Sequence, residues 1–127
     1  MALQMRQVVS PDDVLDLTFS LSTDAYASGD LLADTQEIAN FFRTAGGTAL
    51  VHSIRVLDAD DQAGALDIVF CNASTSLGTE NSAPNISDAN AAIVLGHVPI
   101  TAADYSDLGG CSVATVRNVG LMLKAAA

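Results

Sequence analysis

The most regular feature of the chain is the alternation of apolar and polar residues from Val14 to Ser22. Every second position in this stretch is apolar, namely Leu15, Leu17, Phe19 and Leu21. Successive side chains of a β-strand point to opposite faces, so a period of two predicts a strand with one buried face and one face in water.

Two further strands are predicted in the middle of the chain, over Thr48–Leu57 and Ala65–Cys71. The residues expected to face inward are Leu50, Ile54 and Val56, beside His52, in the first strand, and Leu66, Ile68 and Phe70 in the second. The stretch between the strands, Asp58–Gly64, is rich in turn-forming residues. It therefore predicts that the two strands form a hairpin with a long tip.

Strand-like patterns also occur near both ends of the chain. Ser112–Val116 and Val119–Lys124 are either two strands separated by a loop at residues 117–118 or one bent strand. Leu3–Val9 predicts a short edge strand or an extended arm.

Long irregular stretches connect these elements, at residues 23–29 and 74–87, while residues 31–42 fit either a strand pair or one helical turn. Ser87 is positioned to cap a short helix over Ala89–Leu95, because a serine side chain accepts hydrogen bonds from first-turn amides. Val98–Ile100 is expected to be extended.

These patterns predict an all-β chain with long irregular loops and at most one short helix. The expected organisation is an N-terminal arm or edge strand over residues 1–13, followed by one sandwich or jelly-roll-like domain over residues 14–127. No internal repeat divides the chain further.

The charge of the chain excludes some functions. Its 127 residues carry 15 acidic and 5 basic side chains, a net charge of −10. Nucleic acids and anionic membranes are bound mainly through Lys and Arg, so this balance argues against both. No apolar run approaches the roughly 18 to 20 residues that span a bilayer, and no secretory signal is visible, which fits a protein that assembles in a cytoplasm.

Residues with catalytic potential are few. His52 and His97 are the only histidines, and no Gly-x-Ser-x-Gly sequence accompanies them. Cys71 and Cys111 lack the basic neighbours that favour a thiolate; we interpret them as small buried apolar residues, with a disulfide between them as the alternative. The sequence thus predicts no catalytic residue and no cofactor.

The acidic cluster Asp58, Asp60 and Asp61 begins like a calcium-binding loop. Gly64 comes one place too late for that motif, and Val69 stands where a bidentate Glu is needed. A solvated turn is the favoured interpretation. Calcium held by the turn carboxylates stays an alternative, and no metal site is assigned.

The residue order within whole segments is more informative than their periodicity. These segments are residues 23–32, 45–50, 56–62, 76–89 and 104–110. The longest reads Ser76-Leu-Gly-Thr-Glu-Asn-Ser-Ala-Pro-Asn-Ile-Ser-Asp-Ala89, an order that no general physical constraint dictates. Together they resemble a small virion structural protein of tailed bacteriophages, of the head decoration (cement) type, over most of residues 14–124. Similar proteins continue with strand-forming sequence past the match to residues 119–124, so the resemblance leaves the completion of the C-terminal edge open.

The resemblance implies a non-enzymatic protein on the outer capsid surface of a virion that is assembled in a bacterial cytoplasm. Its expected partners are the major capsid protein, whose subunits it would bridge, and further copies of itself, with a trimer implied by the family type. The alternatives are a tail or baseplate component, which would assemble there or touch host glycans, and a small hydrolase, which the histidines and cysteines disfavour.

Two apolar groups are candidates for the contact with a partner. One is the N-terminal segment, whose apolar residues are Leu3, Met5, Val8 and Val9. The other is the pair Phe41 and Phe42, which would point in opposite directions in an extended chain, one ring toward the core and one toward a partner.

Overall fold

The computed structural model describes residues 15–39 and 41–126. Strands account for 31% of the structure, all pairs are antiparallel, and the helical content of the described residues is two single 3-10 turns. The predicted all-β class with at most one short helix is therefore confirmed. No helix among the described residues is long and apolar enough to cross a membrane.

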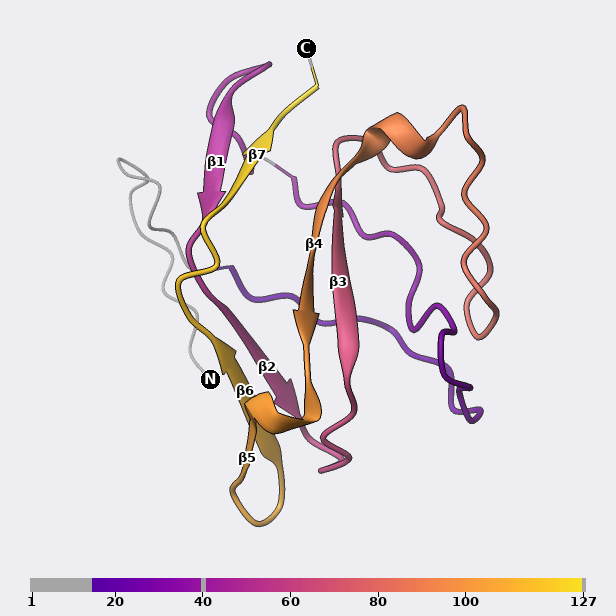
Figure 1. Cartoon of the computed structure of the whole chain (residues 1–127), viewed down its shortest axis with the longest axis vertical. Coiled ribbons are helices and arrows are strands. Elements are labelled where there is room, and N and C mark those ends of the chain that lie inside the picture. Colours follow the sequence, from indigo (N-terminus) through magenta and orange to yellow (C-terminus); the bar gives the residue numbers. More distant parts are fainter. Residues whose placement is uncertain (1–14, 40, 127) are drawn as a thin grey trace.

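Seven strands and two turns make up the fold (Figure 1). In chain order they are β1 (Thr48–Val51), β2 (Ile54–Asp58), β3 (Leu66–Cys71), η1 (Ala91–Ile93), β4 (Val94–Ile100), η2 (Ala102–Asp104), β5 (Tyr105–Asp107), β6 (Ser112–Val116) and β7 (Leu121–Lys124). The pairing is nested: β1 pairs with β7, β2 with β6, and β3 with β4, while β5 adds to the far side of β6.

The β1–β7 and β2–β6 pairs follow one another as a long ladder with a break in its middle. Val51 pairs with Leu121 and Ile54 pairs with Val116, so two residues on one side oppose four on the other. The longer side turns through positive φ angles at Asn118 (54°) and Gly120 (68°). β6 and β7 are thus two strands, which settles the open alternative.

The same break corrects the prediction of one continuous strand over Thr48–Leu57. The strand is interrupted at residues 52–53, and the inward face changes there: Leu50 and His52 are exposed, whereas Ile54 and Val56 are half-buried. The alternation of side chains between the two faces is not continued through residues 52–53, so the residues before and after the break that share a period of two face opposite sides. The period of two alone does not reveal such a break.

The predicted hairpin between the second and third strands is wrong. β2 pairs with β6, and β3 pairs with β4 across a connection of residues 72–93. Residues 59–65 therefore link two different sheets. The alternation within β3 is confirmed, since Leu66 and Ile68 are half-buried and Asp67 is exposed.

The core is small and lies between β4, β6 and β7. Its buried apolar residues among those described are Val98, Ile100, Ala114 and Leu123. β4 approaches β7 closely at Gly96, where a Cβ atom would stand 3.0 Å from the Cδ1 atom of Leu121. Gly96 thus allows the two sheets to pack together.

Two predicted elements near the ends of long loops are wrong. Residues 15–22 form no strand, although they are the most regular stretch in the sequence, and Val14 lies outside the described residues. The segment passes behind the sheets in Figure 1.

The helix expected over Ala89–Leu95 is reduced to the single turn η1. Ser87 does not cap this turn, and Val94 already belongs to β4. The extended conformation predicted for Val98–Ile100 is confirmed.

Candidate functional site

The strongest surface feature is a row of apolar side chains on the first described segment, which pairs with no described strand. We call Leu15, Leu17, Phe19 and Leu21 the apolar row; their exposed fractions are 42%, 41%, 45% and 50%. No backbone hydrogen bond joins residues 15–21 to any other residue that the structure describes. The segment has the sequence of an amphipathic strand, but it pairs with no described strand and all of its residues from 15 to 21 are exposed. It is therefore suited to contact another surface.

The end of the apolar row is held by a hydrogen-bonded group around Glu80. The amide of Ser22 donates to Glu80 Oε1 (2.6 Å) and to the hydroxyl of Tyr26 (2.8 Å), and the Tyr26 hydroxyl lies 2.7 Å from the same carboxylate oxygen. Leu32 contributes its carbonyl oxygen, 2.9 Å from that hydroxyl. Glu80 thus attaches the N-terminal segment to a loop 58 residues further along the chain.

The Tyr26 hydroxyl is expected to ionise at higher pH than a free tyrosine. Reduced contact with water and, after it, the hydrogen bond to Glu80 raise the pKa of Tyr26. The hydrogen-bonded arrangement therefore contributes to stability below the ordinary tyrosine pKa and is lost as pH rises through the raised value. Glu80→Gln removes the negative charge, so it should lower the pKa of Tyr26 toward its ordinary value.

Absorbance titration of the tyrosinates measures this effect, because the chain has two tyrosines and no tryptophan. Tyr26→Phe identifies the Tyr26 transition. Tyr105 serves as the internal reference, since burial chiefly raises its pKa and Glu80 is not among the causes. A Tyr26 transition that Glu80→Gln leaves in place would contradict the hydrogen bond.

An acidic lobe surrounds this group. We define it as residues 22–35 and 74–90, which are joined by reciprocal backbone hydrogen bonds from Leu31 to Ser82 (2.8 Å) and from Asn81 to Leu31 (2.9 Å). It holds five acidic residues and no Lys, Arg or His; the acidic residues are Asp24, Asp30, Asp34, Glu80 and Asp88.

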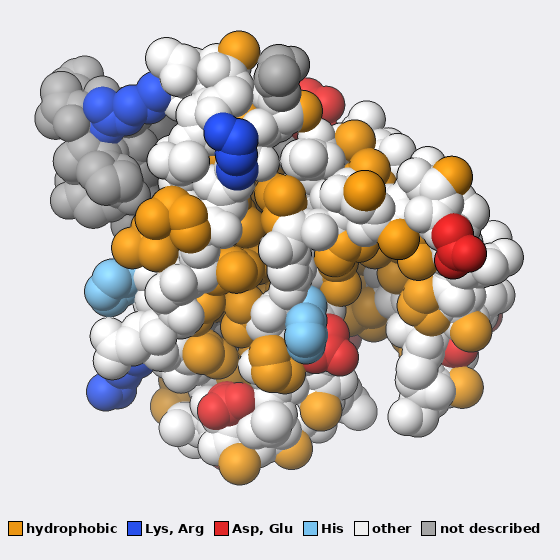
Figure 2. Space-filling model, turned by 45° about the horizontal axis from the view of Figure 1, so that its top comes forward, with side chains coloured by type: hydrophobic (Ala, Val, Ile, Leu, Met, Phe, Trp, Pro, Cys, Tyr) orange, Lys and Arg blue, Asp and Glu red, His pale blue; other side chains and the backbone are white. Residues whose placement is uncertain are grey.

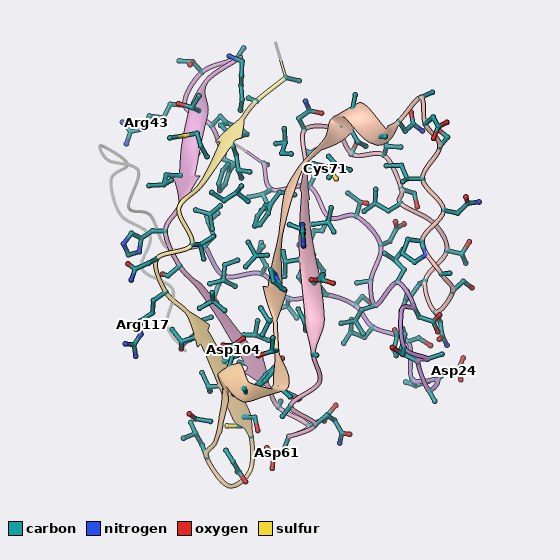
Figure 3. The ribbon with its side chains drawn as sticks, viewed as in Figure 1. Asp24, Arg43, Asp61, Cys71, Asp104 and Arg117 are labelled. Carbon is teal, nitrogen blue, oxygen red and sulfur yellow. The ribbon has the colours of Figure 1, made fainter. Side chains whose placement is uncertain are left out.

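The basic residues lie on the opposite side of the molecule. Four of the five are in the described part. Arg55 lies on β2, Lys124 on β7, Arg117 directly after β6, and Arg43 five residues before β1. In Figure 3, Arg43 and Arg117 lie at the left and Asp24 at the far right. The blue side chains visible in Figure 2 all lie on the left, beside some acidic ones, whereas the acidic lobe carries no basic side chain.

The basic side also has an apolar surface of its own. Leu50 pairs directly with Met122, and Thr48 with Lys124, so these four residues share the outward side of the two strands. We call them the outer face of β1–β7. Leu50 is 41% exposed and Met122 is 60% exposed. The period of two places Leu50 on the inward face, so the sequence alone does not reveal this surface; the register with β7 brings the pair together.

The predicted contact residues are placed only in part. Leu3, Met5, Val8 and Val9 lie outside the described residues and stay a prediction. Phe41 and Phe42 do not point in opposite directions: their rings pack edge to face, with centroids 5.0 Å apart, and both side chains are half-buried. The chain turns here instead of extending, so neither ring stands alone toward a partner.

The phenylalanines line a shallow surface hollow, and a second hollow lies elsewhere on the surface. The first measures about 300 Å³ and also contains Glu37 and Arg43. The second measures about 380 Å³ and lies where β4 meets the link between β6 and β7, with His97 and Arg117 at its edge. Neither hollow brings together a nucleophile, a base and an orienting acid, the arrangement that nucleophilic catalysis requires.

The residues considered for chemistry take ordinary structural positions. Cys71 and Cys111 are free thiols, and burial raises the pKa of Cys71, which disfavours its reactive thiolate. His52, in the break between β1 and β2, and His97, on β4, are both exposed.

The acidic cluster at the start of the β2–β3 link is organised by hydrogen bonds. Both carboxylate oxygens of Asp58 accept backbone amides, from Asp60 (3.0 Å), Gln62 (2.8 Å) and Ala63 (2.8 Å). The Asp61 carboxylate accepts a hydrogen bond from the hydroxyl of Ser112. Across the part of the chain that the structure describes, no group of three or more His, Cys, Asp or Glu is arranged to hold a metal ion.

Comparisons with known proteins give no relative: no family model, no curated protein and no solved structure matches this chain. The resemblance to phage virion proteins therefore stays an expectation from the residue segments quoted above.

Proposed function

We propose that this protein is a non-enzymatic decoration protein of a phage capsid, which binds the outer surface of the head and bridges major capsid subunits. It would act as an oligomer of identical copies, with a trimer expected from the family type. The resemblance of residues 76–89 and the other quoted segments supplies the phage assignment.

The observation that carries the proposal is the contrast between the core and the surface. Four apolar residues are buried among those described, while the apolar row leaves four large side chains half in water on one segment. Exposed apolar side chains gathered in a contiguous patch mark contact surfaces. A protein with this distribution gains most of its remaining apolar burial from a partner, as a capsid-binding protein does.

The charge distribution is compatible with this role. A decoration protein sits outside the shell, away from the packaged DNA, so an acidic surface incurs no repulsion from the nucleic acid inside. The acidic lobe contains the whole 76–89 segment on which the resemblance chiefly rests. A surface charged in this way suits a basic region on the partner, since complementary charges guide association and orientation.

The proposal is tested by locating the protein on virions of the phage that encodes it. The protein is labelled with an electron-dense tag at its C-terminus, added to virions that lack it, and viewed by electron microscopy. We expect label on the head surface, with binding that saturates and that a large excess of unlabelled protein prevents.

The result distinguishes the alternatives. Label on the tail or baseplate would favour the tail component and overturn the capsid role. Absence of label from the whole virion, with protein shown to be folded by circular dichroism, would overturn both virion assignments.

A further inference from the structure

We infer that copies of this protein associate head to tail, with the apolar row of one copy against the outer face of β1–β7 of the next. The inference deepens the proposed self-association. It is tested on purified protein without capsids, so it and the capsid role can fail independently.

The backbone of the apolar row supports strand addition as the mode of contact. Residues 15–21 offer amide and carbonyl groups that bond to no other described backbone. β1 pairs only with β7 among the described strands, so no described strand occupies its second edge. An extended segment that adds to an open edge satisfies both sets of groups, while its alternate side chains enter the apolar surface.

Both surfaces present large apolar side chains. The row presents three leucines and one phenylalanine, and the outer face presents Leu50 and Met122 side by side. Methionine adapts its shape to an aromatic or branched neighbour, which suits it to the centre of such a contact.

The charges of the two surfaces favour contact between the apolar row of one copy and the outer face of another, over contact between two rows. The row contains Asp16 and runs directly into the acidic lobe, so two rows face to face would bring acidic surfaces together. The outer face carries Lys124, whose ammonium group lies 3.3 Å from the carbonyl oxygen of Gly46, and Arg43 lies on the same side of the molecule (Figure 3). An acidic apolar surface therefore meets a basic apolar surface only when one copy follows another.

A head-to-tail contact has a geometric consequence. Each copy uses two different surfaces, so association continues from copy to copy and ends either in a closed ring or in an open chain. Disabling one surface on each of two copies should still leave one intact contact between them. That property separates this interface from one in which each surface contacts its own counterpart on the other copy.

The experiment uses three variants of the full chain, each checked for folding by circular dichroism. Phe19→Asp disables the row and Met122→Glu disables the outer face; both side chains are well exposed, so the fold should persist. Leu108→Glu is the matched control, because Leu108 is 65% exposed but belongs to neither surface. Sedimentation velocity should show that each of the first two variants weakens association about tenfold or more, whereas the control leaves it unchanged.

Mixing then tests the direction of the contact. Phe19→Asp and Met122→Glu proteins, each monomeric alone, should form a one-to-one dimer when combined. Association of the unmodified protein should also weaken as salt is raised, because the Debye length falls from about 10 Å at 0.1 M to about 3 Å at 1 M.

Three results would overturn the inference. The first is an unmodified protein that stays monomeric at high micromolar concentration, which would mean that something other than a second copy covers the row. The second is a Met122→Glu protein that still associates by itself. The third is a mixture that remains monomeric although the unmodified protein associates. Lys124→Glu provides a second disruption of the outer face if Met122→Glu fails to fold.

Discussion

Ile100→Ala should lower the free energy of unfolding by about 2 to 5 kcal/mol, enough to unfold much of the population of a marginally stable domain. Ile100 is 1% exposed at the end of β4, where it pairs with Leu66 of β3. The described core holds only four buried apolar residues, so few neighbours can move to fill the cavity that alanine would leave.

Urea unfolding followed by circular dichroism measures this effect. Leu57→Ala is the matched control: it makes a comparable truncation on β2, but Leu57 is 53% exposed, so the loss should stay below about 1 kcal/mol. Both variants are measured at two protein concentrations, because self-association would add to the apparent stability. Equal losses from Ile100→Ala and Leu57→Ala would contradict the position of the core.

The sequence predicted those elements whose information is local. The alternation in β3 and the strands β6 and β7 follow from their own residues, and the all-β class follows from many such stretches together. β5 was missed, because Tyr105–Asp107 is too short to show a period. The turn before it carries a recognisable signal, the capping box of Thr101 and Asp104, which went unused.

The elements that failed depend on partners far along the chain. Whether β2 pairs with β3 or with β6 is decided by the competition between a nearby strand and one 54 residues or more away, which no local pattern encodes. The segment 15–22 fails differently: its residues suit a strand, but a strand also needs an adjacent edge, and no described edge is paired with it. The pattern predicted the amphipathic character correctly and the buried state wrongly.

The candidate surface was predictable only in outline. The apolar row was visible in the sequence as a strand face, but its exposure became evident only in the structure. The pair Leu50 and Met122 is separated by 71 intervening residues, and only the β1–β7 register brings it together. The absence of basic side chains from residues 22–35 can be seen in the sequence. The distance between the acidic lobe and the basic residues depends on the fold, so the sequence alone does not predict it.

Asp58→Ala should destabilise the protein by about 2 kcal/mol through loss of the hydrogen bonds that shape the link between β2 and β3. Its carboxylate accepts three backbone amides, and hydrogen bonds to a charged acceptor contribute about 1.5 to 3 kcal/mol each where water cannot replace them. The link is partly exposed, so water recovers much of that sum.

The backbone of the link makes the carboxylate more important. Asp61 and Ala63 adopt positive φ angles of 57° and 51°, a conformation that costs a non-glycine residue roughly 1 to 2 kcal/mol. The bonds from Asp58 hold the chain in this conformation. Without them the link should relax, and Asp61 should lose its alignment with the buried hydroxyl of Ser112.

Asp60→Ala is the matched control for this prediction. It removes the same charge two residues away, from a carboxylate that accepts no hydrogen bond from any residue the structure describes. Asp58→Asn keeps one acceptor oxygen and should give an intermediate loss. Urea unfolding measures the three variants, and hydrogen exchange at the amides of Gln62 and Ala63 should accelerate in Asp58→Ala but not in Asp60→Ala. If the two alanine variants lose the same stability, net charge rather than the hydrogen bonds accounts for the effect, and the role assigned to Asp58 is wrong.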